Sequence, residues 1–207
     1  MEKDPYNVVV AGVGGQGNVL GTQLLGAVLV DQGYKVTIGE TYGASQRGGS
    51  VMSHMRVSRT GQYGPLIPPR CADLVIALEP TEALRVLAQF CNSNTITVVN
   101  TRPVFSMDVT CGNLPYPEKE ALHSKINDLS RKAFFLEATD KAIELGNPIL
   151  ANIIMIGAVS GAGILAITEK ELEKAIRENI SQNRIDINLK AFIIGKEMTN
   201  SECVNQC

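Results

Sequence analysis

The chain has 207 residues, 44% of them hydrophobic, and is therefore long enough to bury a sizeable core. Its formal net charge of −2, its 5% aromatic content and its lack of tryptophan argue against a protein that neutralises nucleic-acid phosphates or stacks bases. The charged N-terminus lacks the basic and apolar regions of a signal peptide, so we expect a cytoplasmic protein.

The first part of the chain predicts a strand–loop–helix–strand unit. Residues 6–11 are a short β-branched run, typical of a strand buried on both faces. Residues 18–31 have apolar side chains at helical spacing, and Gly33 follows as a helix stop. Residues 35–39 predict a second strand, and the length of the crossover favours parallel pairing with the first.

The alternation of strands and helices continues through the middle of the chain. Residues 51–57 predict a strand with one polar face, which carries His54 and Arg56. The pattern then predicts a buried strand at residues 73–78, a helix at residues 80–90 and a strand at residues 95–100. Weaker patterns follow: a helix at residues 118–132, a strand at residues 134–137 and a short helix at residues 139–146.

The end of the chain is predicted to be helical. Residues 149–167 are the most apolar stretch, but they contain Asn152, Ser160 and three glycines, which favours a buried helix over a membrane span. Residues 168–171 form a helix-starting capping box, and a last helix is predicted at residues 185–198.

These elements predict an α/β fold: a Rossmann-like, open and mostly parallel sheet with flanking helices and a helical C-terminal part. We expect one domain over residues 1–207. Its parts are an α/β core at about 1–147, C-terminal helices at about 148–200 and a tail at 201–207.

A glycine motif, Gly12-x-Gly14-x-x-Gly17, lies after the first predicted strand and opens the first predicted helix. Glycines at this place let the backbone approach a ligand, and the N–H groups of the helix start favour a phosphate. The candidate binding residues here are Gly12, Gly14, Gly15, Gln16 and Gly17. Glu40 lies about where a ribose-binding acid would be in a dinucleotide site. The motif alone leaves a tight strand–helix turn without a nucleotide as an equal alternative.

A second glycine-rich loop follows the second strand and is predicted at the carboxyl edge of the sheet, beside the first. Its candidate binding residues are Tyr42, Gln46, Arg47, Gly48 and Gly49. The Arg47 guanidinium could fork onto a phosphate or carboxylate, and the two glycines would let the backbone come close. The alternative is a surface loop with a solvated arginine. Two such loops at one edge favour a ligand site or an interface.

The signatures of a complete active site are missing, so no catalytic and no metal-binding residue is predicted. The chain lacks a Walker lysine, GxSxG, HExxH and a Cys–His pair. Asp73, Glu79 and Glu82 are interpreted as solvated or helix-dipole-satisfying acids, and His54 as a structural hydrogen-bonding residue. The five cysteines form no CxxC pair and give no iron–sulfur or zinc signal: Cys71, Cys91, Cys111, Cys203 and Cys207. Cys203 and Cys207 are interpreted as incidental thiols of a polar tail, with a redox or metal pair as the alternative.

Three sequence segments together resemble the gamma-type domain of 2-oxoacid:ferredoxin oxidoreductases: GVGGQG, YGASQRGGSVMSHMRVS and ADLVIALEPTEALR. The later GNPILANIIMIGAVSGAGIL and TEKELEKAI are similar to that family's C-terminal helical part. Within the family, the chain is most similar to the separate small (beta) subunit of indolepyruvate enzymes. The gamma subunits of pyruvate, ketoisovalerate and phenylglyoxylate enzymes are the nearest alternatives.

The resemblance implies a division of labour. Large partner subunits would hold thiamine diphosphate, Mg and [4Fe-4S] clusters, and the complex would convert a 2-oxoacid and CoA to an acyl-CoA, CO2 and reduced ferredoxin. This chain would not be catalytic alone but would support assembly and CoA binding. CoA carries a pyrophosphate and a 3′-phosphate. We therefore place CoA contacts, as a hypothesis from loop placement, at Gly14, Gly15, Gln16, Arg47, Gly48 and Gly49.

Two other functions stay open at this stage. One is a stand-alone NAD(P)-binding Rossmann protein, which the unusual loop after Glu40 disfavours. The other is a purely structural subunit, whose glycine loops contact a partner and no ligand. Neither nucleic acid nor a membrane is expected as a partner.

Overall fold

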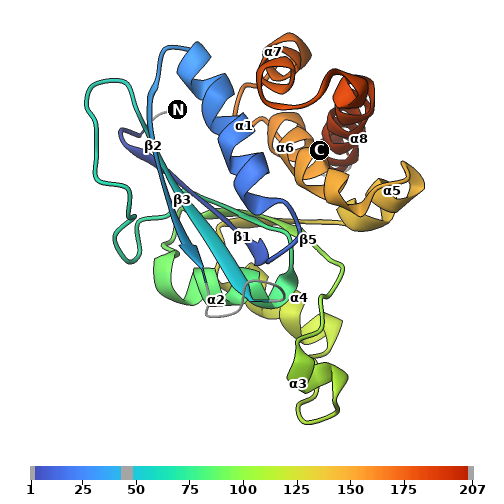
Figure 1. Ribbon diagram of the computed structural model, residues 1–207. Helices are drawn as coiled ribbons and strands as arrows, with labels where there is room; N and C mark the ends of the chain where they lie inside the picture. The colour runs from blue at the N-terminus through green and yellow to red at the C-terminus, as the bar shows by residue number, and fades with distance from the viewer. Residues whose placement is uncertain (1–2, 43–48, 205–207) are drawn as a thin grey trace.

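The computed structural model describes residues 3–42 and 49–204 and contains one six-stranded sheet with helices on both faces (Figure 1). The strands are β1 (Tyr6–Val13), β2 (Lys35–Tyr42), β3 (Ser50–Ser58), β4 (Leu74–Ala77), β5 (Ile96–Asn100) and β6 (Lys132–Leu136). The longer helices are α1 (Asn18–Asp31), α2 (Pro80–Phe90), α4 (Lys119–Asp128), α6 (Ala151–Gly161), α7 (Glu169–Asn179) and α8 (Ile185–Val204). Shorter helical elements are α3 (Met107–Thr110), α5 (Ala138–Glu144) and 3₁₀ turns at Pro148–Leu150 and Gln182–Arg184.

The sheet is open and mostly parallel, as predicted, with the strand order β2-β3-β1-β4-β5-β6. Strands β1, β4, β5 and β6 pair in parallel. Strand β3 is antiparallel and lies between β1 and β2, so the predicted direct pairing of β1 with β2 is wrong. The connection from β2 to β3 spans only residues 43–49, which is too short for a crossover and turns the chain straight back.

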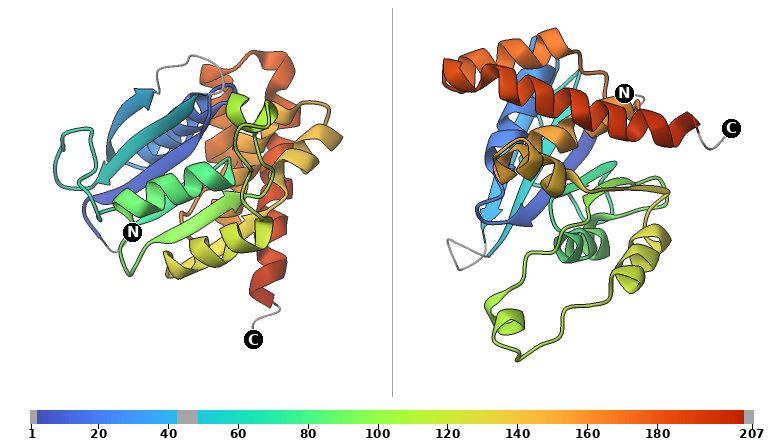
Figure 2. Two further views of the ribbon diagram at one scale, coloured as in Figure 1. Left: turned by 90° about the horizontal axis from the view of Figure 1, so that it is seen from below. Right: turned by 90° about the vertical axis from the view of Figure 1, so that its right-hand side faces the viewer.

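The strands separate two apolar layers through their alternating side chains. Val8 and Val10 face the layer that contains α1, α6, α7 and α8, whereas Val9 and Ala11 face the layer under α2 and α4. Figures 1 and 2 show this asymmetry, with the C-terminal helices gathered on the face of the sheet that α1 covers. The C-terminal part is therefore helical, as predicted, and it packs against the core.

The apolar stretch at residues 149–167 contains α6, which is a buried helix, as predicted. Its close packing against α8 depends on glycine: a Cβ on Gly157 would lie 2.1 Å from the carbonyl oxygen of Phe192. Among the described residues, no helix is long and apolar enough to cross a membrane. The capping box at the start of α7 is also confirmed, since Thr168 Oγ1 accepts a hydrogen bond from the Glu171 amide at 3.3 Å.

Several predicted boundaries need correction. Strand β2 continues to Tyr42 because β3 pairs along its whole length. Helix α4 ends at Asp128 and β6 begins at Lys132, both earlier than predicted. Helix α8 continues beyond residue 198 to Val204.

Candidate functional site

The first glycine loop lies at the carboxyl edge of the parallel strands and is braced by Gln16. The Val13 amide donates a hydrogen bond to Gln16 Oε1, and Gln16 Nε2 donates to the carbonyl of Leu78, both at 2.8 Å. The side chain thus ties the end of β1 to the residue that follows β4. Because its amide oxygen and nitrogen both bond the backbone, Gln16 acts here as a support for the loop.

The glycines of this motif serve different purposes. A Cβ on Gly12 would lie 2.7 Å from both Asn18 Oδ1 and Gln16 Oε1, so this glycine makes room for side-chain amides. Gly17, with φ 77°, precedes α1, and a Cβ there would lie 2.5 Å from Asn152 Nδ2. Gly15 differs, because its φ is 106° and a Cβ would meet no described residue within 4 Å. Gly15 therefore leaves open space before the start of α1.

The two glycine-rich loops meet, as predicted. The Gly14 amide donates a hydrogen bond to the carbonyl of Gly49 at 2.8 Å. The next residue, Ser50, donates from its hydroxyl to Glu82 Oε2 at 2.5 Å, which fixes the start of β3 to α2. Gln46, Arg47 and Gly48 lie outside the described residues.

Tyr42 and Glu40 lie on β2, which β3 separates from β1 and the first loop. The Tyr42 side chain is exposed, and its hydroxyl donates to the Glu40 carboxylate, which raises the pKa of Tyr42. Glu40 is opposite Ser53 of β3, and Ser53 is opposite Val10 of β1. Glu40 is therefore two strand spacings, or about 10 Å, from β1. This position does not match the predicted ribose-binding acid, which requires β2 beside β1.

A buried polar network supports the same edge and was not predicted from the sequence. Asn100, at the end of β5, donates from Nδ2 to the Leu78 carbonyl and to Thr139 Oγ1, both at 2.9 Å. Its Oδ1 accepts from the Thr139 amide at 3.0 Å. The Leu78 carbonyl therefore receives hydrogen bonds from both Gln16 and Asn100. The only local signal was a polar residue at the end of a predicted buried strand.

Glu79 is fully buried beside this network, at the N-cap of α2. Its Oε2 accepts from the Glu82 amide at 2.9 Å and from the Thr81 hydroxyl at 2.6 Å, while its Oε1 accepts from Tyr116 at 2.5 Å. Desolvation and the hydrogen bond to Glu79 raise the pKa of Tyr116. Asp73 and Glu82 are buried as well, so the solvated interpretation of these three acids is wrong. The other interpretation, an acid that satisfies the helix dipole, fits Glu79 at the N-cap and Glu82 in the first turn of α2.

Two buried asparagines lie behind the first loop. Asn152 Nδ2 donates to the Gly17 carbonyl at 3.0 Å and so links α6 to the start of α1. Both amide atoms of Asn18, and Oδ1 of Asn152, have no hydrogen-bond partner among the described residues. They line a small cavity of about 10 Å³, which is at the lower limit for one water molecule. His54 has the structural role predicted for it, since it accepts from the Ile67 amide at 3.4 Å and packs edge-on against Phe90.

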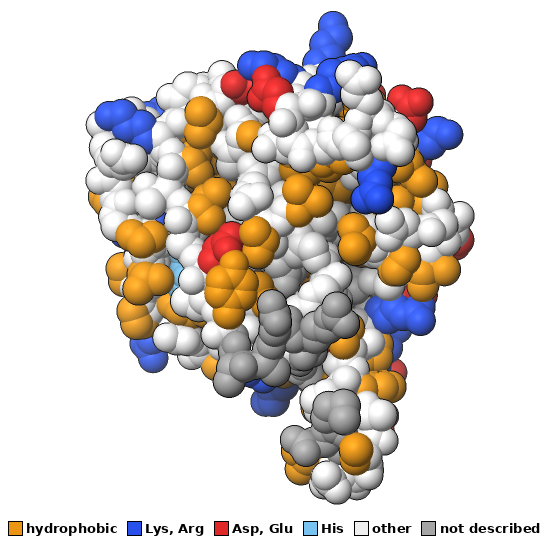
Figure 3. Space-filling view, in the orientation of Figure 1, with side chains coloured by type: hydrophobic (Ala, Val, Ile, Leu, Met, Phe, Trp, Pro, Cys, Tyr) orange, Lys and Arg blue, Asp and Glu red, His pale blue; other side chains and the backbone are white. Residues whose placement is uncertain are grey.

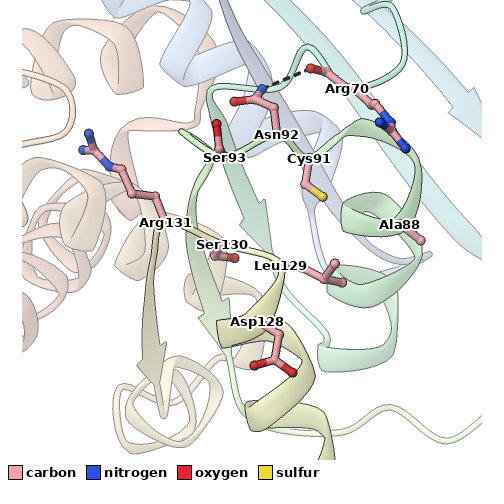
Figure 4. Close-up of a pocket in the computed structure, with 9 residues that line it drawn as sticks. All are labelled: Arg70, Ala88, Cys91, Asn92, Ser93, Asp128, Leu129, Ser130 and Arg131. Carbon is pink, nitrogen blue, oxygen red and sulfur yellow. Dashed lines mark hydrogen bonds between the residues drawn. The ribbon is translucent and has the colours of Figure 1, made fainter.

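A second hollow, of about 590 Å³, lies where α2 and α4 end (Figure 4). Its lining residues are Arg70, Ala88, Cys91, Asn92, Ser93, Asp128, Leu129, Ser130 and Arg131. Figure 4 shows the two arginine side chains on opposite sides of the hollow and not converging on one point. This hollow is at the amino end of β5 and β6, whereas open α/β sheets bind ligands at the carboxyl end. We therefore place the candidate site at the glycine loops.

The fold and the braced loops define an α/β protein with a phosphate-compatible sheet edge. Among the side chains that the structure describes, no group of three or more His, Cys, Asp or Glu is placed to hold a metal ion. The family model for pyruvate ferredoxin/flavodoxin oxidoreductases matches residues 7–198, and the chain belongs to this family. It is thus a small subunit of a 2-oxoacid ferredoxin oxidoreductase, an enzyme made of several subunits.

Its relatives include indolepyruvate oxidoreductase subunits IorB from two archaea. The subunit of Archaeoglobus fulgidus is 36% identical over 91% of this chain and 92% of its own length. That of Thermococcus kodakarensis is 34% identical over 92% of this chain and 94% of its own length. Among solved structures, pyruvate oxidoreductase subunit PORC from Thermotoga maritima has a TM-score of 0.70 at 23% identity, covering 94% of this chain and 97% of that one. This last similarity supports the fold alone.

Proposed function

We propose that the chain is the small subunit of an indolepyruvate-type enzyme and that its glycine loops form part of the CoA site. The enzyme would oxidatively decarboxylate indolepyruvate or another arylpyruvate with CoA, giving an acyl-CoA, CO2 and reduced ferredoxin. The substrate assignment rests on relatives with 30–36% identity that are named for indolepyruvate. A subunit of 2-oxoglutarate synthase from Methanocaldococcus jannaschii is 26% identical, so other 2-oxoacids, including pyruvate, ketoisovalerate and phenylglyoxylate, are the alternatives to test.

The observation that carries the CoA proposal is the hydrogen bond between Gly14 and Gly49. It joins the two loops while Gly15, in the left-handed region, leaves open space at the start of α1. Backbone amides at a helix start are a suitable environment for the phosphates of CoA. A protein with a similar fold, 2-oxoglutarate:ferredoxin oxidoreductase from Magnetococcus marinus, has been solved with coenzyme A and succinyl-CoA bound (TM-score 0.73, 20% identity). This chain covers 32% of that longer chain.

Thiamine diphosphate, Mg and the [4Fe-4S] clusters are assigned in this proposal to large partner subunits, with ferredoxin as the electron acceptor. That assignment rests on the family to which the chain belongs. The contribution of this chain would be to position CoA and to support assembly. Gly12 and Gly17 shape the loop, Gln16 braces it, Gly14 and Gly49 join the two loops, and Gly15 leaves the space that we assign to the ligand.

The test is the CoA KM of the assembled enzyme with a Gly15→Ala variant. A methyl group at Gly15 meets no atom of the described residues within 4 Å but would project toward the proposed ligand, so we expect the KM for CoA to rise about tenfold. Gly33→Ala is the matched control, because Gly33 also has a positive φ, 87°, and open space around it, but lies beyond the far end of α1. An unchanged CoA KM in Gly15→Ala, with the complex intact, would overturn the proposal.

Arg47→Ala tests the second loop independently of its geometry. A raised CoA KM in an intact complex supports a phosphate contact, because an arginine pairs strongly with phosphate. Loss of assembly without a change in CoA kinetics supports the purely structural alternative. The stand-alone NAD(P)-binding alternative predicts NAD(H) binding by the isolated chain, which calorimetry would detect. The interposed β3 disfavours that alternative, because it separates Glu40 from the first loop.

A further inference from the structure

An extended segment at residues 101–118, here called the arm, connects β5 to α4 and projects from the body of the molecule. Figures 1 and 2 show it reaching away from the sheet, with α3 near its tip. Loops of this length with little secondary structure are uncommon inside compact domains and are usually either functional elements or linkers. The arm therefore requires an explanation beyond linking two elements.

The arm exposes several apolar side chains, and its sequence between Arg102 and Glu118 is poor in charge. Phe105 and Leu114 are 55% and 56% exposed, and Val104 is 37% exposed. Between Arg102 and Glu118 the sequence contains a single charged residue, Asp108. On the face that Figure 3 shows, the described atoms of the projection's tip include no Lys or Arg side chain, whereas such side chains are frequent around the rest of the outline. Exposed aromatic and aliphatic side chains with few charges are the composition of an interface core.

The arm is held in a defined shape before any partner binds. The Thr101 amide donates to the Leu136 carbonyl at 2.8 Å at one end. At the other end Tyr116 donates to buried Glu79 at 2.5 Å, and its ring packs edge-on against Phe105 with centroids 5.2 Å apart. A preorganised binding element loses less conformational entropy on association, so its apolar contacts contribute more to affinity.

We propose that the arm docks into an apolar, charge-poor hollow on a partner subunit of the same complex. The chain belongs to a multi-subunit enzyme, so such a partner exists. A standard interface involves about 20–30 residues from each side, and the arm supplies a large share of one side. The occupant in this proposal is a different subunit, because membership of a multi-subunit enzyme supplies one, and a second copy of this chain is an outcome that the test distinguishes.

Glu79 connects the arm to the sheet edge that carries the first glycine loop, so docking of the arm affects that edge. Tyr116 binds Glu79, and the preceding residue, Leu78, accepts the hydrogen bonds of Gln16 and Asn100. A partner that holds the arm thus also steadies the support of the first glycine loop. The docking proposal rests on family membership and on the surface of the arm, and it is independent of the proposed CoA contacts.

The test compares the affinity of two variants of the small subunit for the remaining subunits, measured by sedimentation of the reconstituted enzyme. In the double variant Phe105→Ser/Leu114→Ser, we expect the dissociation constant to rise at least about tenfold, because truncating central apolar anchors is costly. Leu66→Ser is the matched control, since Leu66 is 59% exposed but lies in the β3–β4 connection. Its affinity should be that of the wild type. Equal affinity of both variants and the wild type, or equal weakening of both variants, overturns the proposal.

A second measurement keeps the test decisive if the double variant fails to fold. A photoreactive amino acid at position 105 in the assembled enzyme should cross-link to a partner subunit. Cross-linking only to a second copy of this chain, or no cross-link to any partner, overturns the proposal. The outcome is distinguishable from that of the CoA test: Gly15→Ala changes CoA kinetics in an intact complex, whereas the arm variant changes subunit affinity.

Discussion

Two regions of this molecule are rich in glycine, and the glycines do different work in each. Between α6 and α8, a Cβ on Gly157 or Gly195 would lie 2.1 or 1.9 Å from a backbone carbonyl of the other helix. In the first loop, Gly12 and Gly17 make room for side-chain amides, whereas Gly15 opens toward space that no described residue fills. Glycine frequency alone therefore does not indicate a ligand site, and the surroundings of each Cα have to be considered.

The helix pair and the loop edge are also stabilised by different interactions. The helix pair is held by backbone contact over an apolar interface, which has little room to adjust. The loop edge is held by a few long-range hydrogen bonds, through Gln16, Asn100 and Tyr116. We expect substitutions in the helix pair to destabilise the whole fold and substitutions at the edge to act locally.

The largest expected effect is that of Gly195→Ala. The added methyl group would lie 1.9 Å from the Ile154 carbonyl oxygen, so α6 and α8 must move apart. Overpacking of this kind costs about 3 kcal/mol, which lowers the Tm of a chain of this size by about 6–12 °C. Differential scanning calorimetry of the purified chain measures it.

Gly163→Ala is the control for the helix-pair prediction. Gly163, just beyond α6, has φ 68° and open space around it, so alanine there brings backbone strain but no clash. A cost of about 1 kcal/mol is expected. If the Tm of Gly195→Ala is no lower than that of Gly163→Ala, α6 and α8 can move apart without cost. The statement that the helix pair has little room to adjust would then be wrong.

Local patterns predicted most of the fold but little of the support for the site. Helices α1 and α2 have the predicted bounds, because their stop signal and their Pro80 start are local. The interposed β3 was missed because alternation of elements does not reveal that a short connection turns the chain back. The roles of Gln16 and Glu79 were missed for a similar reason. Their partners, Leu78 and Tyr116, are 62 and 37 residues away, and no periodicity connects them.

A smaller effect is expected for Gln16→Ala. The substitution removes the acceptor of the Val13 amide and the donor to the Leu78 carbonyl, which costs about 2 kcal/mol. Gln32→Ala is the matched control: its Nε2 also donates to a carbonyl, that of Ala166, but at an exposed site where water replaces the bond. Hydrogen exchange should show a faster Val13 amide in Gln16→Ala and unchanged amides in α6. Equal loss of stability in the two variants would contradict a special brace at Gln16.

The smallest expected effect is the response of Tyr116, which ties the arm to Glu79, to alkaline pH. It distinguishes the loop edge from the helix pair, which has no such buried tyrosine. Desolvation and Glu79 raise the pKa of Tyr116 above its unfolded value of about 10. A raised folded-state pKa gives stability that is fully present below pH 10 and is lost as the pH rises further, since the unfolded chain then releases a proton that the folded chain retains. Tyr116→Phe removes both the hydrogen bond and this pH dependence. Urea unfolding should therefore show the variant less stable than the wild type at pH 8, with a smaller difference at pH 11.

Tyr6 does not confound this measurement, although burial and the charge of Asp73 raise its pKa to about 12. Its contribution to stability also falls above pH 10, but it is common to the wild type and to Tyr116→Phe and cancels in their difference. The helix pair contributes no comparable buried tyrosine, because α6 and α8 contain none. A difference between wild type and variant that stays constant from pH 8 to pH 11 would mean that Glu79 does not hold Tyr116 protonated in the folded chain.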